Sequence, residues 1–261
     1  MFKLKDWIDQ DNINWTQLSE NPSASTWLEN NQDKIDWSYL SRNPSARAIA
    51  LLENNQDKIH WTQLSLNPAA LTLLEKNQDK IDWDMLSSNP SARAIALLEK
   101  NQDKINWSQL SRNPSALTLL EKNQYKIYWY QLSQNRSALT LLEKNQDKID
   151  WDSLSYNPSA ITLLEKNQDK IHWSLLSENR SARAIALLEK NQDKIDWFGL
   201  SINLSARAIA LLEKNQDKID WFYLSSNPSA ISLLENNQDN IIWSQLSRNP
   251  AIFERNERCD V

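Results

Sequence analysis

Tryptophan is the residue whose number and spacing first suggest chemistry in this chain of 261 residues. A row of accessible indole rings could stack sugars, nucleic-acid bases or methylated cations. Eleven tryptophans recur at one of two intervals, which differ by two positions: Trp15, Trp37, Trp61, Trp83, Trp107, Trp129, Trp151, Trp173, Trp197, Trp221 and Trp243. Each lies between an isoleucine and a leucine that recur with it, on the constant side of a predicted helix. This position favours packing between stacked repeats over ligand binding.

The other reactive residue types do not form a catalytic or metal-binding constellation. His60 and His172 each replace the Asp or Asn before a tryptophan and lie five repeats apart, so we interpret them as exposed helix caps. Ser41 and its equivalents have no His or Lys partner nearby in the sequence. Acidic and basic residues recur in every repeat, which indicates surface charge pairs rather than one acid–base site. We therefore expect no enzyme, no catalytic residue, no metal and no cofactor.

Composition removes further classes of site. The single glycine excludes glycine-rich phosphate loops. The single cysteine, Cys259, excludes a disulfide framework and a cysteine-based zinc site. The net charge of −5 and the pI near 5.2 argue against a nucleic-acid partner, which would favour a basic surface. Apolar runs are about five residues long, as at 48–52, far short of the roughly 20 needed to cross a bilayer.

The first residues, 1–7, lack the apolar stretch of a signal peptide. Together with the lone cysteine, this predicts a cytoplasmic protein, located in the host cytoplasm or the virion if the protein is viral. A repeat of this nearly constant length indicates a solenoid or array. We expect a single array over residues 1–261, with an N-terminal cap at 1–12, tandem repeats at 13–248, and a C-terminal cap and tail at 249–261.

Each repeat contains two helix starts. At 35–41, Asp36 is a good N-cap, and Ile35 and Leu40 have the spacing of a hydrophobic staple. On a helical wheel the recurring Trp, Leu and Ser fall on one arc and the varying positions on the opposite arc, which favours a helix over a strand. The sequence predicts a short first helix, beginning at each tryptophan.

A second helix is predicted to begin at each Asn-Pro step. In the repeat of Trp37, Asn43 would cap it, with Pro44 at its first position. Its end is expected near Glu53, where Asn55 would take the left-handed conformation that usually requires glycine. Residues 56–58 would then turn into the next repeat.

The two repeat lengths have a simple explanation. Four repeats contain Ser-Ala-Arg-Ala-Ile-Ala-Leu-Leu-Glu, where the others are two positions shorter. The apolar residues stay in phase when counted back from the glutamate. We therefore expect a longer second helix in the repeats of Arg47, Arg93, Arg183 and Arg207.

The pattern Leu-Ser-x-Asn-Pro-x-Ala followed by Leu-Leu-Glu-x-Asn-x-x-Lys-Ile-x-Trp resembles short tandem-repeat proteins of large DNA viruses, over about residues 10–250. The resemblance implies a viral protein of α-solenoid type and carries over no catalytic residue. The predicted fold is all-α, a right-handed α-solenoid of stacked short helix pairs. A leucine-rich-repeat horseshoe is the alternative, because its Leu-Ser-x-Asn pattern and its period are superficially similar.

The varying side of the first helices is polar in most repeats but apolar in two stretches. Such residues on an otherwise polar face suggest a contact surface. The candidate binding residues are Tyr128, Tyr130 and Tyr156 in one stretch, and Phe198, Ile202, Leu204, Phe222 and Tyr223 in the other. We expect a non-enzymatic scaffold that binds a protein partner through this face. The alternatives are a structural, virion or self-associating protein and, with less support, a nucleic-acid-binding array.

Overall fold

The chain folds as stacked short helices in a computed structural model that describes residues 13–252. No strand occurs among these residues, so the horseshoe alternative is wrong and the all-α solenoid is confirmed. The contacts divide the chain into two compact units, residues 1–131 and 132–261, and each is described by itself. The single array over the whole chain and the right-handed superhelix stay predictions, and residues 1–12 and 253–261 of the predicted caps lie outside the described residues.

The N-terminal unit contains alternating first and second helices. Its first helices are α1 (Trp15–Glu20), α3 (Trp37–Leu40), α5 (Trp61–Leu66), α7 (Trp83–Ser88) and α9 (Trp107–Arg112), and the unit boundary falls within α11 (Trp129–Gln134). Its second helices are α2 (Ser25–Glu29), α4 (Ala46–Asn54), α6 (Leu71–Lys76), α8 (Ala92–Lys100) and α10 (Leu117–Lys122). Each Gln-Asp-Lys turn forms one turn of 3-10 helix, such as η4 (Gln56–Lys58), as predicted.

The C-terminal unit continues the same alternation. Its first helices are α13 (Trp151–Tyr156), α15 (Trp173–Glu178), α17 (Trp197–Ser201), α19 (Trp221–Ser225) and α21 (Trp243–Leu246). Its second helices are α12 (Leu139–Lys144), α14 (Ile161–Lys166), α16 (Ala182–Lys190), α18 (Ala206–Glu213) and α20 (Ile231–Glu235). The predicted C-terminal cap is described only as far as the 3-10 turn η14 (Pro250–Ile252).

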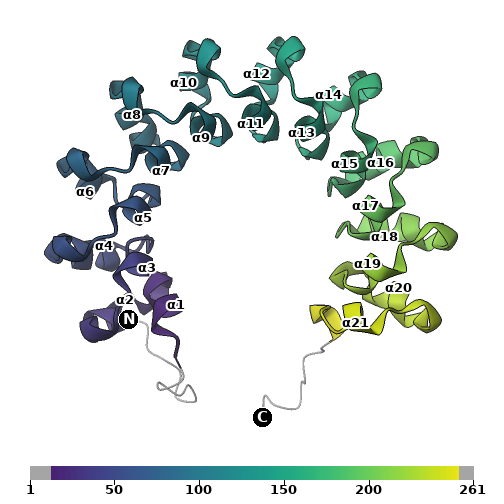
Figure 1. The fold of residues 1–261 in the computed structure, drawn as a ribbon, viewed down its shortest axis with the longest axis horizontal. Coiled ribbons are helices and arrows are strands. Elements are labelled where there is room, and N and C mark those ends of the chain that lie inside the picture. The colour runs from purple at the N-terminus through teal and green to yellow at the C-terminus, as the bar shows by residue number, and fades with distance from the viewer. Residues whose placement is uncertain (1–12, 253–261) are drawn as a thin grey trace. The chain divides into compact units, whose positions relative to one another are not determined.

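Each unit has two layers. First helices of consecutive repeats pack on one another, as α5 does on α7 and α15 on α17, and second helices do the same, as α6 on α8 and α16 on α18. Within each unit the first helices form the inner row of the ribbon and the second helices the outer row (Figure 1). Between the rows lies the core, where leucines such as Leu64 and Leu74 are fully buried. Burial of each such leucine contributes about 1.5–3 kcal/mol.

The predicted caps of the first helices are confirmed. The Asp36 side chain accepts hydrogen bonds from the backbone N–H groups of Ser38 and Tyr39 at the start of α3. His172 does the same through Nδ1, which accepts from the Leu175 N–H at 3.3 Å. His60 takes the N-cap position of α5 without a side-chain hydrogen bond. Both histidines are exposed, as expected for cap substitutes.

The prediction that Asn43 caps the second helix is wrong. Helix α4 begins at Ala46, and its cap is Ser45, whose Oγ accepts from the Ala48 N–H at 3.2 Å. In the shorter repeats the second helix begins later still: α6 starts at Leu71 after an alanine that makes no side-chain cap. The Asn-Pro step therefore forms the bend before the second helix, and the asparagine has a different task.

That task is to join consecutive repeats. The Asn43 side chain is fully buried, and its Nδ2 donates to the backbone carbonyls of Ser19 at 3.0 Å and Asn21 at 3.1 Å, in the preceding repeat. Its Oδ1 accepts from the Ser45 N–H at 3.0 Å. We call this side chain the asparagine clasp. It recurs at Asn67, Asn89, Asn113, Asn157, Asn179, Asn203, Asn227 and Asn249.

The recurring serine forms a second link between repeats. Ser41 Oγ donates to the Trp37 carbonyl at 2.8 Å and accepts from the backbone N–H of His60, which begins the next first helix. The same bridge joins Ser87 to Trp83 and Asn106. The recurring serine thus links the end of one first helix to the start of the next. Clasp and bridge together satisfy backbone groups that would otherwise be buried without partners.

The prediction of a left-handed residue at Asn55 is also wrong. No described residue has a positive φ, and Asn55 has φ −132° and ψ 53°. Its Nδ2 instead donates to the Leu51 carbonyl at 2.9 Å. The side-chain amide thus replaces a backbone donor at the helix C-terminus, where carbonyl groups lack intrahelical partners.

The longer second helices of the four arginine repeats are confirmed. Helices α4, α8 and α16 have 9 residues and α18 has 8, whereas α6, α10, α12 and α14 have 6. Each arginine forms an ion pair with the glutamate at the end of the preceding second helix: Arg47 with Glu29, Arg93 with Glu75, Arg183 with Glu165 and Arg207 with Glu189. The expectation of charge pairs between repeats holds for these groups.

The expectation that the tryptophans fill the core is wrong. The leucine three positions after each of Trp37, Trp61 and Trp83 is fully buried, but the tryptophans themselves are only half-buried. The lysine of the following turn covers the ring, as Lys80 does over Trp61 at 5.0 Å from the ring centroid. Further pairs of this kind are Lys34 with Trp15, Lys58 with Trp37, Lys104 with Trp83, Lys126 with Trp107 and Lys170 with Trp151.

Candidate binding surface

The eight candidate residues lie on or beside the first helices. Six of them are aromatic and exposed, with exposed fractions between 38% for Tyr223 and 56% for Tyr130. Ile202 and Leu204 are half-buried. An exposed aromatic side chain leaves apolar area in contact with water, so this face carries an unfavourable hydration term that a partner could remove.

Three of the aromatic rings form a cluster. The Phe198 ring lies 4.5 Å from that of Tyr223, edge to face, although the two residues belong to consecutive repeats. The Phe222 ring lies 5.0 Å from Tyr223, also edge to face. We call Phe198, Phe222 and Tyr223 the aromatic cluster. Its rings hold one another in a defined arrangement, which favours a specific contact surface over three independent exposed side chains.

Ile202 and Leu204 lie at the end of α17, where the chain bends towards the second helix. Ile202 is the C-cap of α17, and its N–H donates to the Phe198 carbonyl at 3.3 Å. Leu204 occupies the position of the recurring proline, and its carbonyl accepts from Ser229 Oγ at 2.9 Å. These two residues contribute apolar surface beside the aromatic cluster without joining its ring contacts.

The tyrosine stretch is divided by the unit boundary. Tyr128 and Tyr130 belong to the N-terminal unit, and Tyr156 to the C-terminal unit. Each is at least half exposed. Tyr125 is more exposed still, and Lys126 Nζ lies 5.6 Å from its ring centroid. We therefore treat the aromatic cluster, which lies within one unit, as the better-defined site.

Gly199, the only glycine, allows a close approach between α17 and α15. A Cβ atom at this position would lie 3.2 Å from the Ser174 carbonyl oxygen and 3.2 Å from Ser177 Cβ. It would also lie 3.3 Å from Cγ of Glu178. The structure thus brings Glu178 beside the backbone that carries Phe198, a neighbour that the sequence did not indicate.

The face around the aromatic cluster is acidic. Helices α15, α17 and α19 with their N-caps carry the carboxylates Glu178, Asp196 and Asp220, and no lysine or arginine. Both carboxylate oxygens of Asp196 already accept hydrogen bonds within the chain. Its Oδ1 caps α17, and its Oδ2 accepts from Ser174 Oγ. Asp220 caps α19 through Oδ1. This charge opposes the binding of a polyanion.

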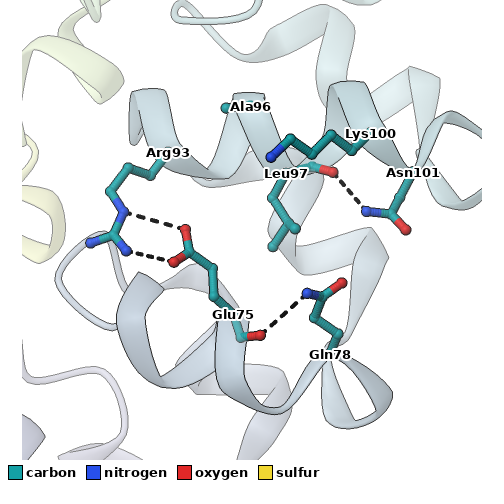
Figure 2. Close-up of a pocket in the computed structure, with 7 residues that line it drawn as sticks. All are labelled: Glu75, Gln78, Arg93, Ala96, Leu97, Lys100 and Asn101. Atoms are coloured by element: carbon teal, nitrogen blue, oxygen red, sulfur yellow. Dashed lines mark hydrogen bonds and ion pairs between the residues drawn. The ribbon is translucent and has the colours of Figure 1, made fainter.

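A pocket on the outer row involves the arginine pairs. Figure 2 shows its lining, in which Arg93 donates two hydrogen bonds to the carboxylate of Glu75. The lining residues are Glu75, Gln78, Arg93, Ala96, Leu97, Lys100 and Asn101. Arg93 also donates to Thr72 Oγ1, and the Gln78 and Asn101 amides donate to backbone carbonyls. Most polar groups here are already paired within the chain, which favours a structural link between repeats.

Of the two equivalent pairs in the C-terminal unit, that of Arg207 and Glu189 has the shorter contact. Arg207 Nη2 lies 2.5 Å from Glu189 Oε2, and Arg207 Nε donates to Oε1 at 3.1 Å. The hydrogen bond from Arg207 lowers the pKa of the Glu189 carboxyl, and the same bond raises the pKa of Arg207. The constant spacing between glutamate and arginine was the sequence signal for these pairs.

Comparison of the chain with models of protein families, with curated proteins and with solved structures gave no match. Among residues 13–252, no helix has the length and apolar character to cross a membrane. The same residues contain no group of three or more His, Cys, Asp or Glu side chains placed to hold a metal ion.

Proposed function

We propose that this protein is a non-enzymatic repeat scaffold that binds a protein partner through the varying face of its first helices. The aromatic cluster of the C-terminal unit is the centre of this contact. One observation carries the proposal: three exposed rings from two consecutive repeats contact one another where most other repeats present polar side chains.

The repeats use different residues for folding and for the varying surface, which supports this proposal. The clasp, the bridge and the buried leucines use residues that recur, whereas the varying positions of α17 and α19 contribute little to the core. A surface can therefore change from repeat to repeat without loss of the fold. Stacked repeats generally use such an extended surface for binding, and large aromatic side chains are enriched among residues that dominate binding energy.

A pull-down from lysate of the source or host cell, read by mass spectrometry, tests the proposal. The test variant carries Phe198→Ser, Phe222→Ser and Tyr223→Ser. The matched control carries Thr62→Ser and Gln63→Ser, which occupy the corresponding positions of α5. Both variants should unfold at about the urea concentration of the wild type.

We expect a protein that the wild type and the control capture and the cluster variant does not. Equal capture by all three, or no capture, would refute the proposal and favour a structural or self-associating role. Capture of nucleic acid, lost at high salt, would favour the nucleic-acid-binding array instead.

A further inference from the structure

The chain itself places a cation over the indole ring in many of its repeats. In six of them the lysine of the turn after the second helix lies over the ring, at 4.6–5.0 Å from the centroid. Such a contact is held by the quadrupole of the ring. Lysines such as Lys80 and Lys104 are themselves exposed, so they cover the ring from its water-facing side.

The repeat that carries α19 lacks this lysine. Asn240 occupies its position, and the only charged residues from Trp221 to Ile242 are Glu235 and Asp239. Each of the other nine complete repeats contains at least one lysine. The Trp221 ring therefore has no lysine of its own repeat to cover it.

The turn that holds Asn240 has the same backbone as the turns that hold a lysine. It forms the 3-10 turn η13 (Gln238–Asn240) and follows Asn237, which has φ −137° and ψ 47°. The turn of Lys80 follows Asn77, which has φ −130° and ψ 53°. The side chain at position 240 therefore starts where a lysine stem starts in other repeats, but it is shorter and carries no charge.

The uncovered ring lies beside the aromatic cluster. Trp221 is half-buried and directly precedes Phe222 on α19. Ile242 is tied to the end of the same helix, because its N–H donates to Ser225 Oγ at 3.0 Å. It stands where most repeats have a polar cap, and it is 38% exposed. Apolar surface thus continues from the cluster past the Trp221 ring.

A carboxylate stands next to the position that the missing lysine would occupy. Asp239 is exposed and makes no ion pair among residues 13–252. In the preceding turn, Lys218 Nζ lies 3.3 Å from the carboxylate of the adjacent Asp217. A carboxylate at this position of the turn can therefore reach a cation beside it, and the charge favours a basic group over an acidic one.

We infer that the protein partner places a lysine or arginine side chain over the Trp221 ring, where other repeats place their own lysine. Its charged head lies near Asp239, and apolar residues beside it contact the aromatic cluster. The long stem of a basic side chain packs on apolar surface while its head stays in water, which suits this half-open site. This inference rests on the proposed function and names the chemistry of the partner.

Two variants of the full chain test this contact. Asn240→Lys gives the repeat the lysine that six others place over their ring, so it fills the site from within. The matched control, Asn236→Lys, adds the same charge four positions earlier, at an exposed site where other repeats have residues such as Lys190. Since both changes introduce the residue of other repeats, both proteins should unfold at about the urea concentration of the wild type.

The probes are random dodecapeptides displayed on phage. They are selected on the wild type and counter-selected on the variant that carries Phe198→Ser, Phe222→Ser and Tyr223→Ser. The affinities of the selected peptides for each protein are then measured by fluorescence anisotropy. Each peptide is also made with its basic residue replaced by norleucine, which keeps the apolar stem and removes the charge.

We expect the selected peptides to share a lysine or arginine next to apolar residues. Their affinity should fall about tenfold on Asn240→Lys, because the chain's own lysine occupies the ring and repels the second cation. It should stay unchanged on Asn236→Lys. The norleucine peptides should bind the wild type about tenfold more weakly, and their affinity should not fall further on Asn240→Lys, since both changes remove one contact.

Two results would overturn the inference. Peptides that depend on the aromatic cluster but contain no basic residue, or bind Asn240→Lys as well as the wild type, would refute the contact with Trp221 and leave the protein-binding surface in place. Failure to enrich any peptide that depends on the aromatic cluster would refute both the contact and the proposed function.

Discussion

Replacing Asn67 by aspartate should destabilise the protein strongly, although the two side chains have nearly the same shape. Asn67 Nδ2 donates to the backbone carbonyls of Ser41 at 3.1 Å and Asn43 at 3.0 Å. Its Oδ1 accepts from the Ala69 N–H at 3.0 Å. The residue is 2% exposed, so water cannot replace a lost partner. The Asn67→Asp change keeps the acceptor and removes the donor.

The expected cost follows from these contacts. Two buried carbonyl groups lose their donor, and a carboxylate is buried against them without a cation. We expect the free energy of unfolding to fall by about 3–5 kcal/mol at pH 7. The loss in free energy of unfolding should become smaller in acid, since a protonated carboxyl can donate one of the two lost hydrogen bonds. Burial raises the pKa of the new group in the folded state, so the variant gains stability relative to the wild type as the pH falls.

Urea unfolding followed by tryptophan fluorescence measures this difference. Asn54→Asp makes the same chemical change at the exposed end of α4 and should cost less than about 1 kcal/mol. An Asn67→Asp protein within about 1 kcal/mol of the wild type at pH 7 would refute the clasp as a source of stability. A loss in free energy of unfolding that becomes larger in acid would refute the hydrogen-bond explanation.

Three further changes test the other links between residues. Ser87→Ala removes the acceptor of the Asn106 N–H and should lower the free energy of unfolding by about 1–3 kcal/mol in urea, against less than about 0.5 kcal/mol for the exposed Ser23→Ala. Lys104→Met removes the cation over Trp83 and should cost about 0.5–1 kcal/mol and alter the fluorescence, whereas Lys100→Met should change neither. In an NMR pH titration, Arg207→Ala should move the midpoint of the Glu189 carboxyl upwards; an unchanged midpoint would mean that this ion pair is not formed in solution. Because the pKa of Glu189 is lowered in the folded state, the small stabilisation from this pair is present above its unfolded pKa and lost as the pH falls through the folded pKa.

The helices themselves were predictable because the signals for them are local. Asp36 and Leu40 lie within about one turn of the helix that they define, and the two extra positions before Glu53 lengthen α4 without changing its phase. The candidate face was also predictable, since a helical wheel separates recurring from varying positions.

The roles of two recurring asparagines were not predictable in the same way. Asn43 has the sequence context of a helix cap, but its partners Ser19 and Asn21 belong to the preceding repeat. Asn55 follows a helix in the position that favours a left-handed residue, and only the structure shows its amide on the Leu51 carbonyl. A residue that recurs in every repeat is equally compatible with bonds inside its repeat and bonds to a neighbouring one.

The tryptophans were misplaced for a related reason. Their regular spacing indicates a constant environment, but it does not say whether that environment is buried or half covered by a lysine such as Lys80. Glu178 and Gly199 became part of the candidate site only through the contact between α15 and α17.

The reach of the asparagine clasp has a consequence for how such a chain can change its length. Each clasp ends on the backbone of the repeat immediately before it, whether that repeat is of the shorter or the longer kind. Because the acceptors are main-chain carbonyls, a clasp does not depend on which side chains its neighbour carries. An unequal crossover that adds or deletes one whole repeat would place each asparagine clasp beside the main-chain carbonyls that it needs. The gene can therefore be lengthened, shortened or shuffled in whole repeats, and each new arrangement would present a different order of surface residues on an unchanged frame.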